Sequence, residues 1–224
     1  GVKRSGASIA FAWSEDGGQT FQDERLVRDQ SCECCRIGLA LTGQGMPAIL
    51  YRAIFEGGVR DHASQMFMEP QAEGPVRRVA VDDWKTDSCP HHGPSLAVSA
   101  HDTLHAAWFT QGDERAGLFY ARSTDAGEHY SKPREIGNPD RQPGRPYLYA
   151  HGHQVWLVWK EFDGKKVTVW EQRSNDDGAS WNTPAQVAEA VGYTDHPILI
   201  SNGSRVFLSW FTAANGYRLM ELSR

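Results

Sequence analysis

The sequence has few cysteines, no long apolar run and no excess of positive charge. Its net charge is −5, so it presents no basic field that would attract nucleic acid. No apolar stretch approaches the roughly 20 residues that a membrane-spanning helix needs. Four cysteines in 224 residues are too few for a disulfide-dense miniprotein. We therefore expect neither nucleic-acid binding nor a membrane span.

The abundant residues favour an all-β chain. The sequence holds 8 tryptophans, 22 glycines and 11 prolines, which is typical of many short strands and turns rather than long helices. It begins at Gly1 without a methionine or a signal peptide. We expect that processing, or a boundary set within a longer chain, removed what preceded it.

One eight-residue pattern, S-x-D-x-G-x-x-aromatic, occurs three times. The copies are residues 14–21, 123–130 and 174–181, and their aspartates are Asp16, Asp125 and Asp176. The aspartate can accept hydrogen bonds from nearby backbone N–H groups, and the glycine takes left-handed dihedrals. Each copy follows an alternating apolar run. The pattern therefore predicts a tight turn between two strands, covered by the aromatic residue.

A second repeat runs in step with the first. Residues 92–96, 144–148 and 195–199 each predict a strand, and their starts are separated by 52 and then 51 residues. The strand that follows each of them ends in a tryptophan: Trp108, Trp159 or Trp210. A third strand comes next, and in two of the three units it leads into the aspartate-containing turn. A period near 50 with four strands is typical of a β-propeller blade.

The three turns resemble the Asp-box of bacterial sialidases and related propellers. The chain is thus similar to the sialidase-like, or BNR-repeat, β-propeller family. The pattern gives about 17 strands where six four-stranded blades need 24. We expect a six-bladed ring whose N-terminal blades are missing from this chain, with four to five blades present. A smaller or irregular propeller is the alternative. Without a linker, residues 1–224 are predicted to form one domain.

The propeller geometry separates structure from chemistry. Asp-box turns lie on one face, so Asp16, Asp125 and Asp176 are interpreted as structural. Loops that enter each first strand lie on the other face, where function is expected. These loops are residues 32–36, 89–93, 141–145 and 192–196. All four cysteines fall in two of them, in adjacent blades.

These four loops surround one opening of the propeller's central channel, which we call the mouth. Thiolates beside imidazoles predict a transition-metal site for Cu(I) or Zn(II) there. The candidate ligands are Cys34, Cys35, Cys89, His91 and His92. His62 and His196 are outer possibilities, and the other histidines are expected to be ordinary surface or strand residues. The alternative is a disulfide from Cys32 or Cys34 to Cys89, which would join neighbouring blades. Both hypotheses require the two cysteine loops to meet.

The resemblance implies a further hypothesis, sialidase or related glycoside hydrolase activity. It would make Tyr193 the nucleophile and Glu161 its activating partner, with Arg36 and Arg145 holding the substrate carboxylate. The family's early arginine motif is absent here, and the acid/base aspartate would belong to the missing front. A third hypothesis is a non-catalytic propeller that binds a glycan or a protein at the mouth. The resemblance also implies a periplasmic or extracellular location.

Overall fold

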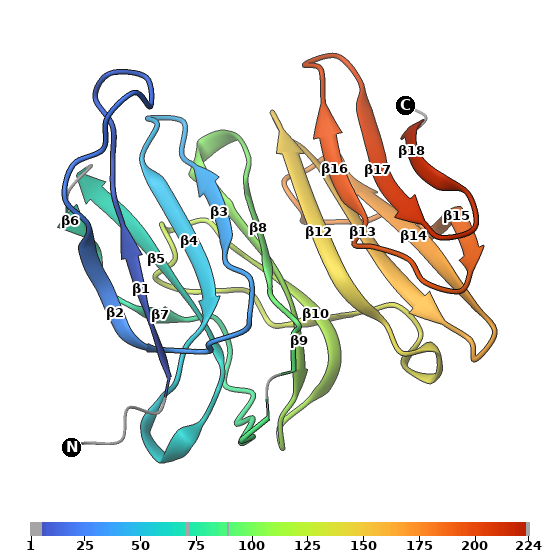
Figure 1. Ribbon diagram of the computed structural model, residues 1–224, viewed down its shortest axis with the longest axis horizontal. Coiled ribbons are helices and arrows are strands. Elements are labelled where there is room, and N and C mark those ends of the chain that lie inside the picture. The colour runs from blue at the N-terminus through green and yellow to red at the C-terminus, as the bar shows by residue number, and fades with distance from the viewer. Residues whose placement is uncertain (1–5, 70–71, 89, 223–224) are drawn as a thin grey trace.

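The computed structural model describes residues 6–69, 72–88 and 90–222, and its regular structure consists of β-strands with three short 3-10 turns. The predicted all-β fold is confirmed. Within the described residues no helix is long and apolar enough to cross a membrane. The strands form five antiparallel sheets that follow one another along the chain (Figure 1).

The bounds of the strands agree with the predicted order. The first sheet is β1 (Ala7–Phe11) and β2 (Arg25–Ser31). The second is β3 (Gly38–Leu41), β4 (Pro47–Arg52) and β5 (His62–Glu69), with β6 (Ala72–Glu73) and β7 (Arg77–Arg78) both paired to β5. The third is β8 (Ser95–Val98), β9 (Leu104–Gln111), β10 (Ala116–Ser123) and β11 (Arg134–Ile136).

The fourth sheet is β12 (Gly144–His151), β13 (Gln154–Phe162), β14 (Lys166–Ser174) and β15 (Ala185–Val191). The fifth is β16 (Ile198–Ser201), β17 (Val206–Thr212) and β18 (Gly216–Glu221). The 3-10 turns are η1 (Glu56–Gly58), η2 (Ala100–Asp102) and η3 (Pro139–Arg141). The number of blades in a complete ring stays a prediction.

The first strand of each later sheet is its inner strand. β3, β8, β12 and β16 contact one another in this order, and they pack closely. A Cβ atom on Gly38 would lie only 2.9 Å from the backbone nitrogen of Leu96 in the next sheet. The Ser95 hydroxyl accepts a hydrogen bond of 2.9 Å from the Leu148 amide in the sheet after that. The inner strands therefore fix how neighbouring sheets face each other.

The three repeated tryptophans form the cores between sheets. Trp108, Trp159 and Trp210 are almost completely buried, and each indole N–H has a hydrogen-bond acceptor. Trp108 donates to Asp82 over 2.8 Å, Trp159 to Glu161 over 3.0 Å, and Trp210 to the Asp195 carbonyl over 3.1 Å. Because a buried indole needs a partner for its N–H, these acceptors accompany the apolar packing.

The Asp-box turns connect third to fourth strands. Asp176 accepts the Ser180 amide over 2.8 Å and the Ser180 hydroxyl over 2.6 Å, while Ser174 donates to Asp176 over 2.7 Å. These bonds lower the pKa of Asp176 to about 2, the Ser180 hydroxyl bond contributing most. Asp16 and Asp125 lie in the corresponding turns, between β1 and β2 and between β10 and β11, and bond similarly.

The aromatic residue of a box packs against the preceding sheet. Trp181 meets Tyr120 edge to face, with ring centroids 4.9 Å apart, and the Arg134 guanidinium lies 4.9 Å from the Trp181 ring centroid. Phe21 occupies the same box position at the N-terminal end, yet 66% of its surface is exposed. One motif position is thus an interface residue in one sheet and a surface residue in another.

This contrast gives a stability prediction. Trp181→Ala removes a partly buried ring that packs between two sheets, and we expect a loss of about 2–3 kcal/mol in the free energy of unfolding, because its contacts with Tyr120 and Arg134 are lost. Phe21→Ala is the matched control and should change it by no more than about 0.5 kcal/mol. Urea denaturation of both variants makes the comparison. Equal effects would contradict the assigned packing.

Candidate functional site

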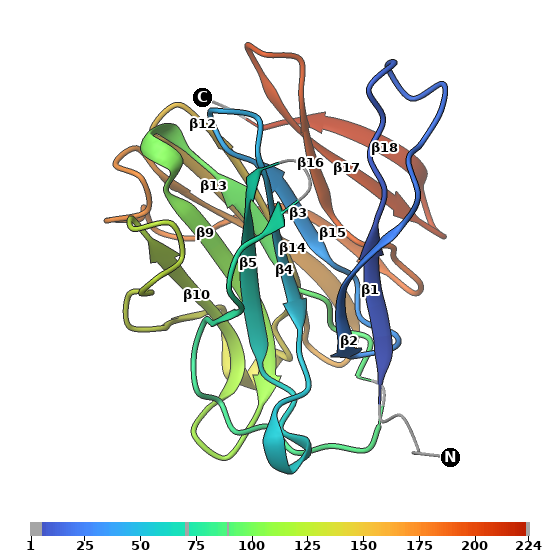
Figure 2. The same ribbon diagram turned by 90° about the vertical axis from the view of Figure 1, so that its left-hand side faces the viewer.

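The mouth loops and the Asp-box turns lie at opposite ends of the strands. In Figures 1 and 2 the turn after β1 is at the top, whereas the loop from β2 to β3 and the turn from β4 to β5 are at the bottom. The loop from β2 to β3 carries Cys32, Cys34 and Cys35. The structure therefore separates the cysteine loop from the Asp-box turn as the propeller geometry predicts.

Three free thiols form the centre of the candidate site. Cys32 is held at the end of β4, where its amide donates to the Arg52 carbonyl over 2.9 Å. The Cys32 sulfur lies 3.7 Å from that of Cys34 and 2.8 Å from that of Cys35. All three sulfurs lie within 4.8 Å of one another. The sequence prediction used Cys34 and Cys35 as ligands but assigned Cys32 only to a disulfide.

A buried arginine lies beneath the thiols. The Arg52 guanidinium donates to the carbonyls of Arg60, His92 and Phe109, over 3.1, 3.1 and 2.9 Å respectively. Its carbon also lies 4.3 Å from the centroid of the Trp84 ring, a cation–π distance. Arg52 therefore joins four segments of the mouth and brings a positive charge into it.

The thiols do not share one protonation state. A hydrogen bond from Cys35 is the largest cause that lowers the pKa of Cys32 to about 5, and the Arg52 charge acts in the same direction. The pKa of Cys35 is raised, first because it keeps the proton that it donates to Cys32 and second because it is buried. At neutral pH, Cys32 is the thiolate of the pair.

The cysteine loop and the predicted histidine loop meet. A Cβ atom on Gly93 would lie 2.7 Å from the backbone nitrogen and oxygen of Arg36, and Arg52 bonds the His92 carbonyl. His92 stacks on Phe109 with ring centroids 4.2 Å apart. Its pKa is lowered to about 4, first by burial and then by nearby arginines, so its ring is neutral.

The predicted histidine ligands are not gathered with the thiols. Among the described residues, no imidazole nitrogen lies within 4.8 Å of all three sulfurs. His91 is exposed, and His62 is fully buried with neither ring nitrogen hydrogen-bonded. His92 Nδ1 is also buried without a hydrogen-bond partner. Cys89 lies outside the described residues.

Three cationic side chains gather at the same mouth. Arg36 contacts His196, and Arg145 donates to the His91 carbonyl. Lys160 donates to the Thr194 hydroxyl over 2.7 Å. Burial lowers the pKa of both Arg36 and Lys160, to about 8 for the lysine, and the Arg145 charge lowers both further. The Arg145 charge disfavours both neighbouring cations, while Asp195 partly offsets it, so an added anion near Arg145 would be favoured.

The structure does not bring Tyr193 and Glu161 together. Glu161 is buried and its Oε1 accepts the Asn138 amide over 2.8 Å and the Trp159 indole N–H over 3.0 Å. Tyr193 has 69% of its surface exposed, and no hydrogen bond joins its hydroxyl to another described residue. The two side chains lack the mutual bond that activates a nucleophile.

Sequence reasoning placed Asp61 in a loop of the mouth but did not predict its burial or its hydrogen-bond partners. Asp61 is fully buried, pairs with Arg78, and accepts the amides of Asp82, Asp83 and Trp84 over 2.8, 3.1 and 3.2 Å. These bonds shape the chain that approaches the His92 loop. The segment that donates these amides carries only a weak sequence signal, because a pair of aspartates before a tryptophan, here Asp82, Asp83 and Trp84, is too common to be specific. Sequence reasoning missed the group of His101, His153 and Asp177, which lies near the Asp-box turns.

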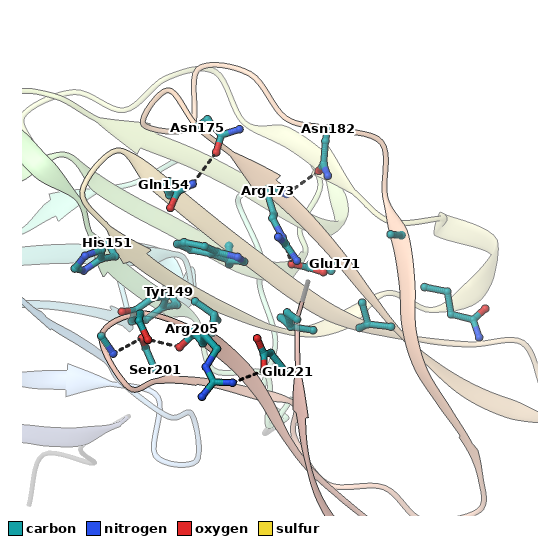
Figure 3. A pocket seen from close by; sticks show the side chains of 18 residues that line it. Tyr149, His151, Gln154, Glu171, Arg173, Asn175, Asn182, Ser201, Arg205 and Glu221 are labelled. Atoms are coloured by element: carbon teal, nitrogen blue, oxygen red, sulfur yellow. Dashed lines mark hydrogen bonds and ion pairs between the residues drawn. The ribbon is translucent and has the colours of Figure 1, made fainter. Parts of the chain in front are cut away.

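A cleft on another part of the molecule is distinct from the mouth. Its volume is about 710 Å³, and it lies between the β12–β15 and β16–β18 sheets (Figure 3). Its lining includes the ion pairs Arg173–Glu171 and Arg205–Glu221. By the strand register, Glu171 stands where Tyr120 contacts Trp181 one sheet earlier. The cleft thus corresponds to a place that a box aromatic fills in the preceding interface.

Comparison with known proteins identifies the fold. No protein-family model and no curated protein matches the chain. Similar structures include a Dyadobacter fermentans protein of unknown function (14% identity, TM-score 0.61), the Hadza microbial sialidase Hz136 (17%, 0.57) and a Penicillium chrysogenum α-L-arabinanase (12%, 0.58). They cover 95%, 90% and 83% of this chain, which spans 62%, 48% and 60% of theirs.

These identities show the fold alone. The chain has a β-propeller fold of four-stranded sheets, as the sequence predicts, and the similar structures include propeller glycosidases. Membership of the sialidase family is a resemblance carried by the Asp-boxes. The fold places the mouth loops together, and the side chains there define the candidate chemistry.

The protonation of the thiol pair can be measured. In metal-free protein, alkylation of Cys32 by iodoacetamide should rise with pH around a midpoint near pH 5, because the thiolate is the nucleophile. Cys35→Ala removes the main hydrogen-bond donor and should move this midpoint upward, towards the ordinary value of about 8.5. Peptide mass spectrometry follows each cysteine separately. Cys34→Ala is the comparison variant and should move it less; a wild-type midpoint above pH 8 would contradict the assignment.

Proposed function

We propose that this chain is a propeller-fold binding protein whose mouth holds a thiophilic metal ion, Cu(I) or Zn(II), through Cys32, Cys34 and Cys35. The observation that carries the proposal is the convergence of three sulfurs within 4.8 Å. Thiolates at about 2.3 Å from a tetrahedral ion are separated by about 3.8 Å. The Cys32–Cys34 distance of 3.7 Å fits this spacing, and Cys35 would move outward to reach it.

The electrostatics support an anionic metal centre. Three thiolates around a divalent ion carry a net charge of −1, and around Cu(I) of −2. Arg52 lies where its charge lowers the pKa of Cys32, and Arg60 also interacts with Cys32. The lowered pKa of Cys32 makes its thiolate the more readily available of the Cys32–Cys35 pair. The arginines would offset the charge of the loaded centre.

The fourth ligand would come from the neighbouring loop. Residues 90–93 pack against the cysteine loop, and the His92 ring is neutral with a free Nδ1. Cys89, His91 and His92 are therefore the predicted candidates for completing the shell. A disulfide to Cys89 from Cys32 or Cys34 is the competing hypothesis, and it would remove a thiolate that the metal needs.

Anionic-glycan binding is the second candidate function. The cluster of Arg36, Arg145 and Lys160 supports it, because carboxylates pair well with convergent guanidinium and ammonium groups. The sialidase among the similar structures supports a sugar acid as the ligand class. Hydrolysis through Tyr193 would need a base other than Glu161, whose Oε1 bonds elsewhere. A periplasmic or extracellular location remains a prediction from the resemblance.

The metal proposal predicts a specific loss of binding. Protein purified without added metal is analysed for bound elements and then titrated with Zn²⁺ and with Cu(I). Serine replacement of Cys32, Cys34 or Cys35 should each weaken the affinity by at least about tenfold, equivalent to about 1.4 kcal/mol. His129→Ala, an exposed residue of an Asp-box turn, is the control. Unchanged affinity in all three serine variants, or a mass 2 Da below that of the fully reduced chain, would overturn the proposal.

The glycan proposal has its own test. Binding of free sialic acid and of galacturonate is measured by NMR, and Lys160→Met or Arg145→Met should weaken it by at least about tenfold, because each variant removes one cation. Arg205→Gln, on the distant cleft, is the control. If neither acid binds the wild-type chain, this function is excluded for them. A fluorogenic sialoside tests turnover, which Tyr193→Phe should abolish if Tyr193 is a nucleophile.

A further inference from the structure

Three turns from two neighbouring sheets converge at His101, His153 and Asp177. His101 belongs to η2 between β8 and β9, His153 to the turn between β12 and β13, and Asp177 to the Asp-box turn after β14. One ligand atom from each lies within 4.8 Å of the others. His153 Nδ1 is 2.6 Å from Asp177 Oδ2, and the two imidazole centroids are 5.1 Å apart.

Main-chain bonds hold these turns together without help from the three side chains. The Ala100 amide donates to the Gly152 carbonyl over 2.8 Å, which ties η2 to the β12–β13 turn. The Asp177 amide donates to the His153 carbonyl over 3.0 Å, which ties that turn to the Asp-box. The three donor groups are therefore positioned by backbone before any ion binds, which reduces the entropy cost of assembling a site.

A buried hydrogen-bond chain orients the carboxylate. Asp177 Oδ1 accepts from the Ser99 hydroxyl over 2.7 Å, and that hydroxyl bonds His105 Nε2 over 2.8 Å. His105 Nδ1 in turn meets the Tyr120 hydroxyl over 2.8 Å. Burial lowers the pKa of His105 to about 4, so the ring is neutral and donates to Ser99 while accepting from Tyr120. The chain occupies Oδ1 and leaves Oδ2 directed at His153.

The Asp-box itself does not require this carboxylate. By the repeat, the position of Asp177 is taken by Gly17 in the first box and by Ala126 in the second, and both turns form. The bonds that the three turns share are made by Asp176, one residue earlier, and by its counterparts Asp16 and Asp125. Asp177 is therefore an addition to a turn that folds without it, and it lies between two histidines.

We infer that His101, His153 and Asp177 form a second metal site, for a divalent ion of the Zn(II) class, on the Asp-box face. Two imidazoles and one carboxylate are a donor set that such ions accept, and three protein ligands leave one position for water. The ion would replace the proton between His153 Nδ1 and Asp177 Oδ2. That separation would widen from 2.6 Å to about 3.3 Å, the spacing of tetrahedral ligands at about 2.0 Å.

The absorption spectrum of bound Co²⁺ can distinguish this site from the thiol site in the full chain. Co²⁺ bound by thiolates gives intense sulfur-to-metal charge-transfer absorption, whereas a nitrogen and oxygen site gives only weaker d–d bands. We expect His101→Ala, His153→Ala and Asp177→Ala each to weaken Co²⁺ binding at the nitrogen and oxygen site by at least about tenfold. The sulfur bands, if present, should not change. Competition with Zn²⁺ then gives the Zn²⁺ affinity of the same site.

Two features of the chain make the test sharp. Asp177→Ala introduces the residue that Ala126 already places in the sister turn, so folding should be preserved, as circular dichroism and thermal unfolding can verify. His151→Ala is the matched control, because His151 is an exposed histidine beside the same turn but outside the group. The inference is overturned if the d–d bands and their affinity survive all three substitutions, or if wild-type protein binds no Co²⁺ or Zn²⁺ beyond the thiol site.

Discussion

Packing between neighbouring sheets is the constraint on which the rest of this structure depends. A single four-stranded sheet cannot bury both faces, so each blade relies on the next. The inner strands and the loops that enter them approach so closely that Gly38, in β3, and Gly93, before β8, leave no room for a side chain. Trp108, Trp159 and Trp210 are buried in the cores between the sheets. This arrangement sends every loop that enters a first strand to one end. The chemistry of the mouth is a consequence of that convergence.

Arg52 contributes both to the packing of the mouth and to its electrostatics. A buried guanidinium is costly unless its donors are satisfied. Here the carbonyls of Arg60, His92 and the β9 residue Phe109 accept from its two terminal nitrogens, while its Nε has no partner among the described residues. The same charge stabilises the Cys32 thiolate. The residue that joins segments of the mouth therefore also contributes to lowering the pKa of Cys32, so the shape and the electrostatics of the mouth are linked.

The sequence predicts the fold well because the same pattern of strands and turns recurs along the chain. Strand order, the position of each buried tryptophan and the placement of Asp16, Asp125 and Asp176 in turns all follow from a period near 50. The side-chain partners do not. Glu161 accepts hydrogen bonds from the Asn138 amide and the Trp159 indole N–H, and no sequence pattern predicts these partners. The fourth strand of the second sheet is split into β6 and β7, since no Asp-box sets its turn.

The two groups of potential metal ligands differ in how far the sequence alone could predict them. Cys32, Cys34 and Cys35 lie within four residues, so their proximity is local and could be predicted. His101, His153 and Asp177 are separated by up to 76 positions along the chain, and backbone bonds join the three turns of two sheets that carry them. Their chemistry also differs. Thiolates favour soft ions, whereas imidazoles with a carboxylate favour borderline ones, and Zn(II) is compatible with both proposed donor sets.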